Sequence, residues 1–247
     1  TSQVPLTTGA LGSAVKEQIP QVKNSVRILS RSATGRFTVQ FEDKKFYSGE
    51  HLITEPTFFE VFNFKLIKGN KKTALNEPNS VVLTKETARK FFNEDNPLGK
   101  VLTTERLGEL IVTGVAENIP HNSHLSFEML ISLSTIEMNE GWNKWINSWE
   151  SEWITSYLLL ENNTNINEVE KIIAEEGRKN FKESGSLSRT FSLQPIKEIH
   201  FNSAGFEFDY LNYNPGDKKY IYILSVVAAF ILFIACINFM NISTAKS

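Results

Sequence analysis

The chain has 247 residues, which is enough for one large or two small domains. Hydrophobic residues make up 41% and charged residues 22%, as in ordinary globular proteins, and a net charge of -2 excludes the basic footprint of a nucleic-acid-binding protein. The single cysteine, Cys236, excludes a disulfide framework. The chain begins at Thr1 without a basic and apolar leader, so we expect a piece of a longer protein and not a secreted precursor.

The first part of the chain is predicted to contain one helix and three strands. Leu11, Val15 and Ile19 recur at helical spacing and predict a helix over residues 6–19, which Pro20 ends. Phe37, Val39 and Phe41 alternate with polar residues, which is the pattern of a half-buried strand. The predicted strands cover residues 22–30, 37–41 and 45–54, with a hairpin turn at 33–35.

The middle of the chain alternates short helices with strands. Pro56 followed by three phenylalanines on one helical face predicts a short aromatic helix up to Phe62. Thr84 is predicted to cap a helix over residues 85–92, and Glu86 favours the helix dipole. The other elements predicted here are strands over residues 80–83, 100–104, 110–116 and 125–133, and a turn at 96–99.

The last part before the C-terminal run follows the same mixed pattern. Residues 134–153 are predicted to be irregular or helical, and residues 169–181 form an amphipathic helix. The flanking strands are predicted at 154–160 and 190–193. This mixture of strands and short helices predicts an α+β fold.

The sequence carries no phosphate-binding glycine loop, zinc-protease motif, nucleophile elbow or paired-cysteine metal motif. His121 and His124 lie three residues apart, but a metal site needs a further ligand, so histidines held by hydrogen bonds in a turn are favoured. Glu150 and Glu152 offer an acid and a base only if a pocket brings them together. We therefore expect no enzyme, no catalytic or metal-binding residues, and no cofactor on this chain.

Four tryptophans recur every three or four residues and would line one face of a helix. Such a stripe serves as a packing surface, a ligand-stacking platform or a protein interface, where tryptophan is enriched. Packing is the plainest interpretation, and interface aromatics are the functional one. The residues are Trp142, Trp145, Trp149 and Trp153.

The C-terminal run is the most informative segment, because residues 220–245 contain no charge. About 20 apolar residues span a hydrocarbon core of about 30 Å, so residues 220–242 are predicted to form a transmembrane helix. A buried helix of a soluble protein is the alternative, but the rest of the chain is too short and polar to cover it.

The polar residues of this run have expected places in a membrane. Tyr220 and Tyr222 lie where interfacial aromatics belong. Asn238 and Asn241 are one turn apart, and such side chains in lipid tend to hydrogen-bond to a neighbouring helix. The few flanking lysines do not set the orientation of the helix.

Several blocks of the sequence resemble the permeases of MacB/FtsX-type ABC transporters, in the form common in Bacteroidetes. The run ACINFMNISTAKS at residues 235–247 closely resembles their second transmembrane helix. Further blocks follow in the family's order and extend the resemblance over essentially the whole chain. They lie at residues 56–64, 77–84, 96–100, 112–115 and 119–124.

The resemblance implies a two-lobed extracytoplasmic MacB-like core domain of α+β fold, followed by a transmembrane α-helix. It implies a core domain over residues 1–219, an inserted lobe at approximately 56–120, the span at 220–242 and the start of a cytoplasmic loop at 243–247. The family's other membrane helices and its nucleotide site are missing.

The resemblance also implies a function in the bacterial inner membrane, with the main domain in the periplasm. ATP bound to an ABC ATPase subunit would be the energy source, and a second permease copy would complete a homodimer or a related heterodimer. A periplasmic adaptor or a substrate is a further expected partner, and nucleic acid is not. The domain would transmit motion from the cytoplasm to a substrate or partner outside, as in export or efflux.

Two other functions stay open on the residues alone. The chain could be the ligand-sensing outer domain of a membrane-anchored signalling receptor, which would need a ligand pocket and a signalling coiled coil after the helix. It could also be a membrane-tethered enzyme, which would need titratable groups converging in a pocket.

Overall fold

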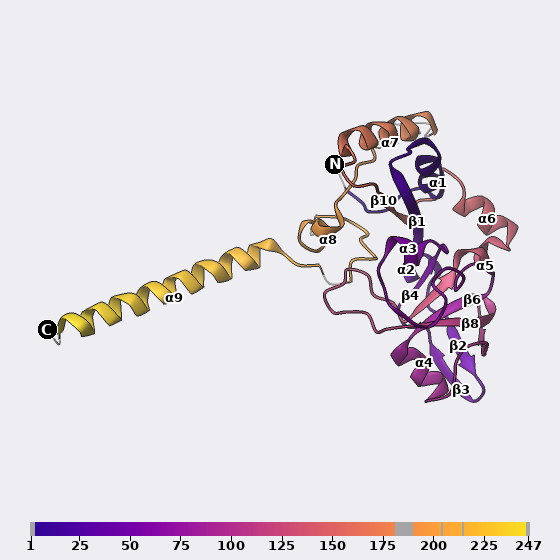
Figure 1. The fold of residues 1–247 in the computed structure, drawn as a ribbon, viewed down its shortest axis with the longest axis horizontal. Helices are drawn as coiled ribbons and strands as arrows, with labels where there is room; N and C mark the ends of the chain where they lie inside the picture. The colour runs from indigo at the N-terminus through magenta and orange to yellow at the C-terminus, as the bar shows by residue number, and fades with distance from the viewer. Residues whose placement is uncertain (1–2, 181–189, 204, 214, 246–247) are drawn as a thin grey trace.

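A computed structural model describes residues 3–180, 190–203, 205–213 and 215–245. These residues form strands and short helices followed by one long helix that extends away from the rest of the molecule (Figure 1). The predicted α+β class is confirmed. The strands are β1 (Val22–Ser30), β2 (Thr38–Phe41), β3 (Lys44–Tyr47), β4 (His51–Thr54), β5 (Leu66–Gly69), β6 (Ser80–Thr84), β7 (Val101–Thr104), β8 (Gly108–Ala116), β9 (Met129–Ser132) and β10 (Ile154–Leu160).

These strands join into one mixed sheet. Its order is β10-β1-β4-β9-β6-β8-β7-β2-β3, and β5 pairs with β8 beyond the end of β7. The pairs β4–β9 and β6–β8 are parallel, whereas the other pairs are antiparallel. Strands far apart in sequence are therefore neighbours, and local sequence patterns do not predict these pairings.

The central strands are buried on both faces of the sheet. Along β6, Val81 and Leu83 point into one hydrophobic cluster while Val82 points into the other. Strands β4 and β9 divide their side chains in the same way, with Ile53 on one face and Leu52 on the other. Strands covered on both faces read as continuous apolar runs and not as alternating ones, as these do.

Short helices cover the two faces. The helices are α1 (Gly9–Gln18), α2 (Arg31–Thr34), α3 (Phe58–Val61), α4 (Lys85–Phe92), α5 (Leu133–Glu137), α6 (Glu140–Ile146), α7 (Ile166–Asn180), α8 (Ile196–Asn202) and α9 (Lys218–Ala245). Helices α4, α5 and α6 bury side chains in the cluster of Val81, and α3 buries Phe58 and Phe59 in the cluster of Val82. Helices α1 and α7 pack together in a third cluster at the β10 edge.

Several local predictions are confirmed. Strands β1 and β10 have the predicted bounds, and α4 begins where its cap predicts. The Thr84 side chain accepts a hydrogen bond from the backbone N–H of Thr87 at 3.3 Å, and Glu86 lies in the first turn. Cap and amphipathic spacing are local properties, so the sequence carries them directly.

The strand predicted over residues 45–54 is wrong, because the chain breaks there into β3 and β4. Strand β3 pairs with β2 at one edge of the sheet, and β4 pairs with β1 and β9 near the other. Between them Ser48 is buried, and its N–H donates to the carbonyl oxygen of Phe37 at 2.7 Å. The chain crosses the sheet at this point, and the Ser48-Gly49 dipeptide, a turn signal inside the predicted strand, marks the crossing.

Other predicted elements also differ from the structure. Residues 33–35 do not form a hairpin turn, since β1 and β2 lie far apart in the sheet and are joined through α2, which Gly35 ends at φ +71°. The strand at 125–133 is restricted to β9, and residues 190–193 form no strand. Strand β5 and helix α8 were not predicted. The predicted end of the helix at 181 lies outside the described residues, and the inserted lobe at 56–120 stays a prediction.

Candidate functional site

In the described part of the chain, no residue of the long C-terminal helix is buried. Helix α9 has 28 residues, a peak mean hydropathy of 2.7, and no buried residue in that apolar window. At 1.5 Å per residue it is about 42 Å long, which exceeds the hydrocarbon core of a bilayer. Among the described residues it is the one helix long and apolar enough to cross a membrane.

The structure exposes each predicted membrane residue of α9. Tyr220 and Tyr222 lie in its first turns with about two thirds of their surface exposed. Asn238 and Asn241 lie in its last third and are exposed, without a side-chain hydrogen bond in the described chain. The predicted interfacial tyrosines and helix-packing asparagines stay predictions, because neither a membrane nor a partner helix is present.

The tryptophans do not share one helical face. Helix α6 carries Trp142 and Trp145 but ends at Ile146, so Trp149 and Trp153 follow on the turn before β10. At the end of the helix the Asn147 side chain turns back, and its Nδ2 donates to the carbonyl oxygen of Asn143 at 3.0 Å. The predicted stripe is therefore wrong as a helical surface.

Three of the four tryptophans still meet in space. The Trp142 and Trp145 rings are perpendicular with centroids 5.5 Å apart, and together with Trp153 they line a cavity of about 450 Å³. Ala33, Asn139 and Gly141 complete the lining. The fourth, Trp149, packs against the cluster between α1 and α7. The size and the aromatic walls suit a small ligand or an inserted side chain, so the predicted interface aromatics remain a prediction.

The candidate acid–base and metal residues are not brought together. His124 lies in an aromatic cluster, where its Nε2 is 3.1 Å from the hydroxyl of Tyr157, while His121 is exposed on the turn before it. Glu150 and Glu152 lie exposed on the turn after α6. Among the residues that the structure describes, no three His, Cys, Asp or Glu side chains lie close enough to hold a metal ion.

Burial changes the ionisation of two histidines. Desolvation lowers the pKa of His124 to about 4. The pKa of His51 is also about 4, chiefly because of burial, while a hydrogen bond to Gly49 opposes the shift and the charge of Arg31 adds to it. Both rings are therefore neutral at pH 7 in the folded protein.

We call the described residues 3–180 and 190–203 together the lobe. We expect the free energy of unfolding of the lobe to fall as the pH drops from 6.5 to 4. The folded pKa of each buried histidine lies below the unfolded value of 6.5, so the unfolded chain binds more protons in this window. The urea midpoint measured at pH 7 and pH 5 checks this, and His124→Gln should reduce the difference. His121→Gln, on the exposed turn, is the control, and equal midpoints for the unaltered chain would contradict the prediction.

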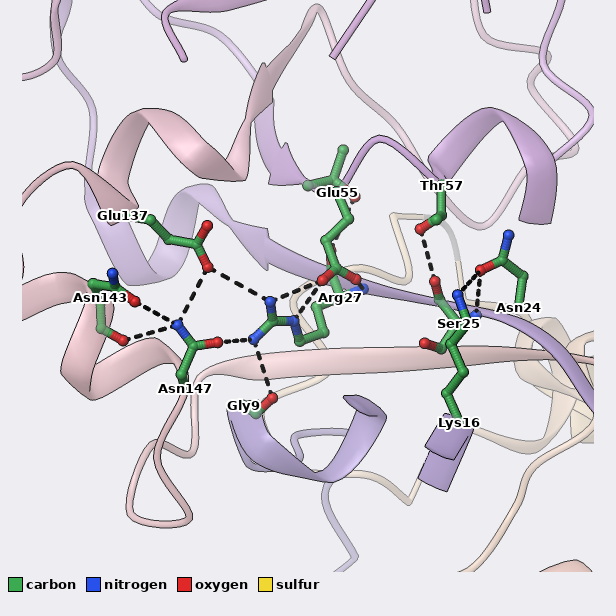
Figure 2. Close-up of polar contacts among 11 residues, drawn as sticks. Gly9, Lys16, Asn24, Ser25, Arg27, Glu55, Thr57, Glu137, Asn143 and Asn147 are labelled. Atoms are coloured by element: carbon green, nitrogen blue, oxygen red, sulfur yellow. Dashed lines mark hydrogen bonds and ion pairs between the residues drawn. The ribbon is translucent and has the colours of Figure 1, made fainter. Parts of the chain in front are cut away.

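A buried arginine connects four segments of the lobe. Figure 2 shows the Arg27 guanidinium held from several sides: its Nε donates to Glu55 at 2.9 Å and its Nη1 donates to Asn147 at 2.8 Å and to the carbonyl oxygen of Gly9 at 3.2 Å. The side chain is 7% exposed, and Glu137 lies 3.6 Å from Nη2. The group therefore ties β1 to the chain after β4, to α1, and to the ends of α5 and α6.

Close packing supports the same junction. Gly9 donates its N–H to the Ser151 hydroxyl at 2.9 Å, and a side chain at this position would collide with the carbonyl oxygen of Ile146. Helix α1 is therefore held directly against the turn that carries Trp149 and Trp153. This junction was not predicted from the sequence, although Arg27, the one charged residue in the apolar half of β1, was a signal for it.

Comparisons with known proteins give one family and a consistent fold. Residues 2–176 match the MacB-like periplasmic core domain family. A permease-protein domain from Porphyromonas gingivalis is 24% identical with a TM-score of 0.61, covering 79% of this chain and 88% of its own. No curated protein matches the sequence.

Two further solved structures share the fold at lower identity. The periplasmic region of MacB from Actinobacillus actinomycetemcomitans has 18% identity and a TM-score of 0.52, covering 70% of this chain and 73% of its own. The extracellular domain of the noncanonic ABC-type transporter YknZ from Gram-positive bacteria has 16% identity and a TM-score of 0.52, covering 71% of this chain and 84% of its own. At these identities the likeness shows the fold alone.

Proposed function

Because the chain belongs to the MacB-like periplasmic core domain family, we propose that it is the extracytoplasmic part of an ABC transporter permease subunit. The observation that carries this proposal is that one chain contains both a core domain of this family and an exposed helix of membrane length. The lobe would lie in the periplasm, and α9 would enter the inner membrane. The chain itself would bind no cofactor, since ATP would bind to a partner ATPase.

The proposed role is mechanical. ATP hydrolysis by an ABC ATPase in the cytoplasm would tilt or shift α9, and the lobe would move a substrate or a partner outside the membrane. A second permease copy would complete the transporter, and a periplasmic adaptor would extend it in an efflux system. Asn238 and Asn241 support the membrane part of this assembly, because polar side chains in lipid need partners on other helices.

The rigidity of the lobe supports transmission of motion. Its sheet is buried on both faces, and the Arg27 junction connects segments that are distant in sequence. Packed interiors are close to crystalline in density, so a displacement at one end moves the lobe as a body. Three tryptophans around an open cavity give the moving lobe a surface suited to holding a partner side chain.

The proposal is tested by loosening the connection between lobe and helix. A ten-residue Gly/Ser insertion between Gly216 and Asp217, in the complete permease with its ATPase in proteoliposomes, should leave ATP hydrolysis running but reduce transport at least about tenfold, because flexible linkers do not transmit displacement. The same insertion after Asn162, on an exposed loop, is the control. Unchanged transport would refute mechanical coupling, and failure to associate with any ATPase would favour the sensor alternative.

A further inference from the structure

A nine-residue segment, residues 205–213, runs between α8 and α9 and is docked on the lobe; we call it the strap. Its backbone binds two separate parts of the chain. The N–H of Glu207 donates to the carbonyl oxygen of Gln3 at 2.9 Å, and Phe206 forms a parallel bridge with the same residue. The N–H of Tyr213 donates to the carbonyl oxygen of His124 at 2.9 Å.

Two side chains of the strap anchor it to the lobe. Leu211 is 6% exposed and enters the hydrophobic cluster that contains Phe58 and Phe62. Tyr210 stacks on Trp153 with centroids 6.1 Å apart and an interplanar angle of 7°. Trp153 also lines the tryptophan cavity, so the strap contacts that cavity's wall directly.

The docked strap also carries features that oppose docking. Phe208 has φ +59°, a conformation that a bulky residue seldom adopts and that persists only where its surroundings impose it. Asp209 is partly buried, and this loss of hydration raises the pKa of its carboxyl, although the N–H of Asn212 donates to it at 3.3 Å and opposes the shift. The side-chain oxygen of Asn212 is buried and has no hydrogen-bond partner in the described structure.

These opposing features occur where movement would matter most. Tyr213 and Lys218 are five peptide steps apart, which span at most about 18 Å. While Leu211 is buried, the start of α9 cannot move further than that from the lobe. The N–H of Gly216 also donates to the carbonyl oxygen of His200 in α8 at 2.7 Å. Once the strap leaves the lobe and this hydrogen bond breaks, the same helix gains the additional reach of the strap itself.

We propose that the strap is a conformational latch with a docked state, seen here, and an undocked state in which Leu211 leaves the core and Tyr210 leaves Trp153. Docked, it fixes α9 and the N-terminal segment at Gln3 to the lobe. Undocked, it permits the lobe to change its position relative to the membrane. This inference rests on the proposed function, because it describes how the connection between lobe and helix is switched.

Distance measurements on the complete permease with its ATPase in nanodiscs test the latch. Spin labels at Glu207→Cys on the strap and Lys68→Cys on the lobe, in a Cys236→Ser background, should give one distance without nucleotide. A second, longer distance should appear during ATP turnover. A single unchanged distance during active transport would overturn the latch and leave the proposed function intact.

Two leucine truncations separate undocking from general loss of stability. Leu211→Ala should raise the undocked fraction without nucleotide by roughly tenfold or more, because a buried leucine anchor is lost. Leu75→Ala is the control, because Leu75 is 1% exposed in the same cluster and the substitution removes the same atoms. This variant should leave the strap distance unchanged. Equal effects of both variants on the strap distance would contradict the proposal.

A reversible cross-link tests whether undocking is needed. Gln3→Cys with Phe206→Cys, which form the bridge, should abolish transport when oxidised and restore it on reduction. Gln40→Cys with Lys45→Cys, a directly paired position of β2 and β3, is the matched control and should have no effect. Full transport by the oxidised strap variant overturns the latch, whereas transport that survives the Gly/Ser insertion after Gly216 overturns the proposed function.

Discussion

Replacing Arg27 by alanine is expected to lower the free energy of unfolding of the lobe by about 3–5 kcal/mol. The guanidinium is 7% exposed, and its Nη2 lies 2.8 Å from the carboxylate of Glu55, which is 20% exposed. Truncation removes the donors from this carboxylate, from Asn147 and from the carbonyl oxygen of Gly9. A buried acceptor that loses its donor bears its full desolvation cost, so the loss exceeds that of an ordinary hydrogen bond.

Thermal unfolding of the chain in detergent measures this effect, and the midpoint should fall by about 10 °C. Arg27→Lys should recover only part of the loss, because an ammonium group cannot reproduce the forked geometry. Arg89→Ala is the matched control: Arg89 pairs with Glu94 at 3.2 Å, but both side chains are at least 76% exposed. Exposed pairs contribute about 0–1 kcal/mol, and an equal shift for both variants would refute the buried junction.

Placing two aspartates in the middle of α9 is expected to prevent its insertion into a membrane. Val227 and Ile231 are four residues apart near the centre of the apolar window. Each aspartate costs about 2.5–3.5 kcal/mol at the centre of a membrane helix, and each lost Val or Ile adds a few tenths more. The pair therefore opposes insertion by about 6 kcal/mol or more, which is sufficient to reverse it.

An insertion assay checks this prediction without the rest of the protein. Residues 218–245 are placed in a host membrane protein with glycosylation acceptor sites on either side, which report whether the segment spans. Val227→Asp with Ile231→Asp should not span, whereas Tyr220→Asp, at the edge of the run, should cost much less. If the central and edge substitutions behave alike, or the unaltered segment fails to insert, α9 is not a transmembrane helix.

In the proposed permease, the Arg27 junction and α9 would be the two ends of one mechanical element. The Arg27 junction fixes α1 and the tryptophan turn to the sheet, and in the proposed permease the lobe would move as a body. Helix α9 lies outside this body and reaches it through the strap. In the proposed permease, force would enter at the helix and leave at the lobe surface, and the strap would decide how tightly the two are connected.

The candidate site was partly visible in the sequence. The four tryptophans were identified as a group with functional potential, and three of them line one cavity. Their predicted arrangement on one helix was wrong, because α6 ends at Ile146 and the chain that follows runs to the buried Ser151, whose hydroxyl accepts a hydrogen bond from Gly9. Spacing of three or four residues describes a helical face only while the helix continues.

The sequence by itself determined the elements whose sequence signal is local. The apolar run of α9, the capped and amphipathic α4, and the strands β1 and β10 each carry their signal within a few consecutive residues. The family blocks belong here too, since residues 2–176 match the family that they indicated. A uniform apolar segment of membrane length needs no partner to be identified.

Only the tertiary structure decided which distant residues meet. Strands β3 and β4 separate because their hydrogen-bonding partners lie far apart in the strand order of the sheet. Arg27 is buried where acceptors from four segments converge on it. The docking of Leu211 likewise depends on a core whose buried residues, from Val26 to Leu130, precede it by more than 80 positions. Local periodicity records which face of an element is buried, but it does not record what covers that face, and this pairing is set by the packing of the whole lobe.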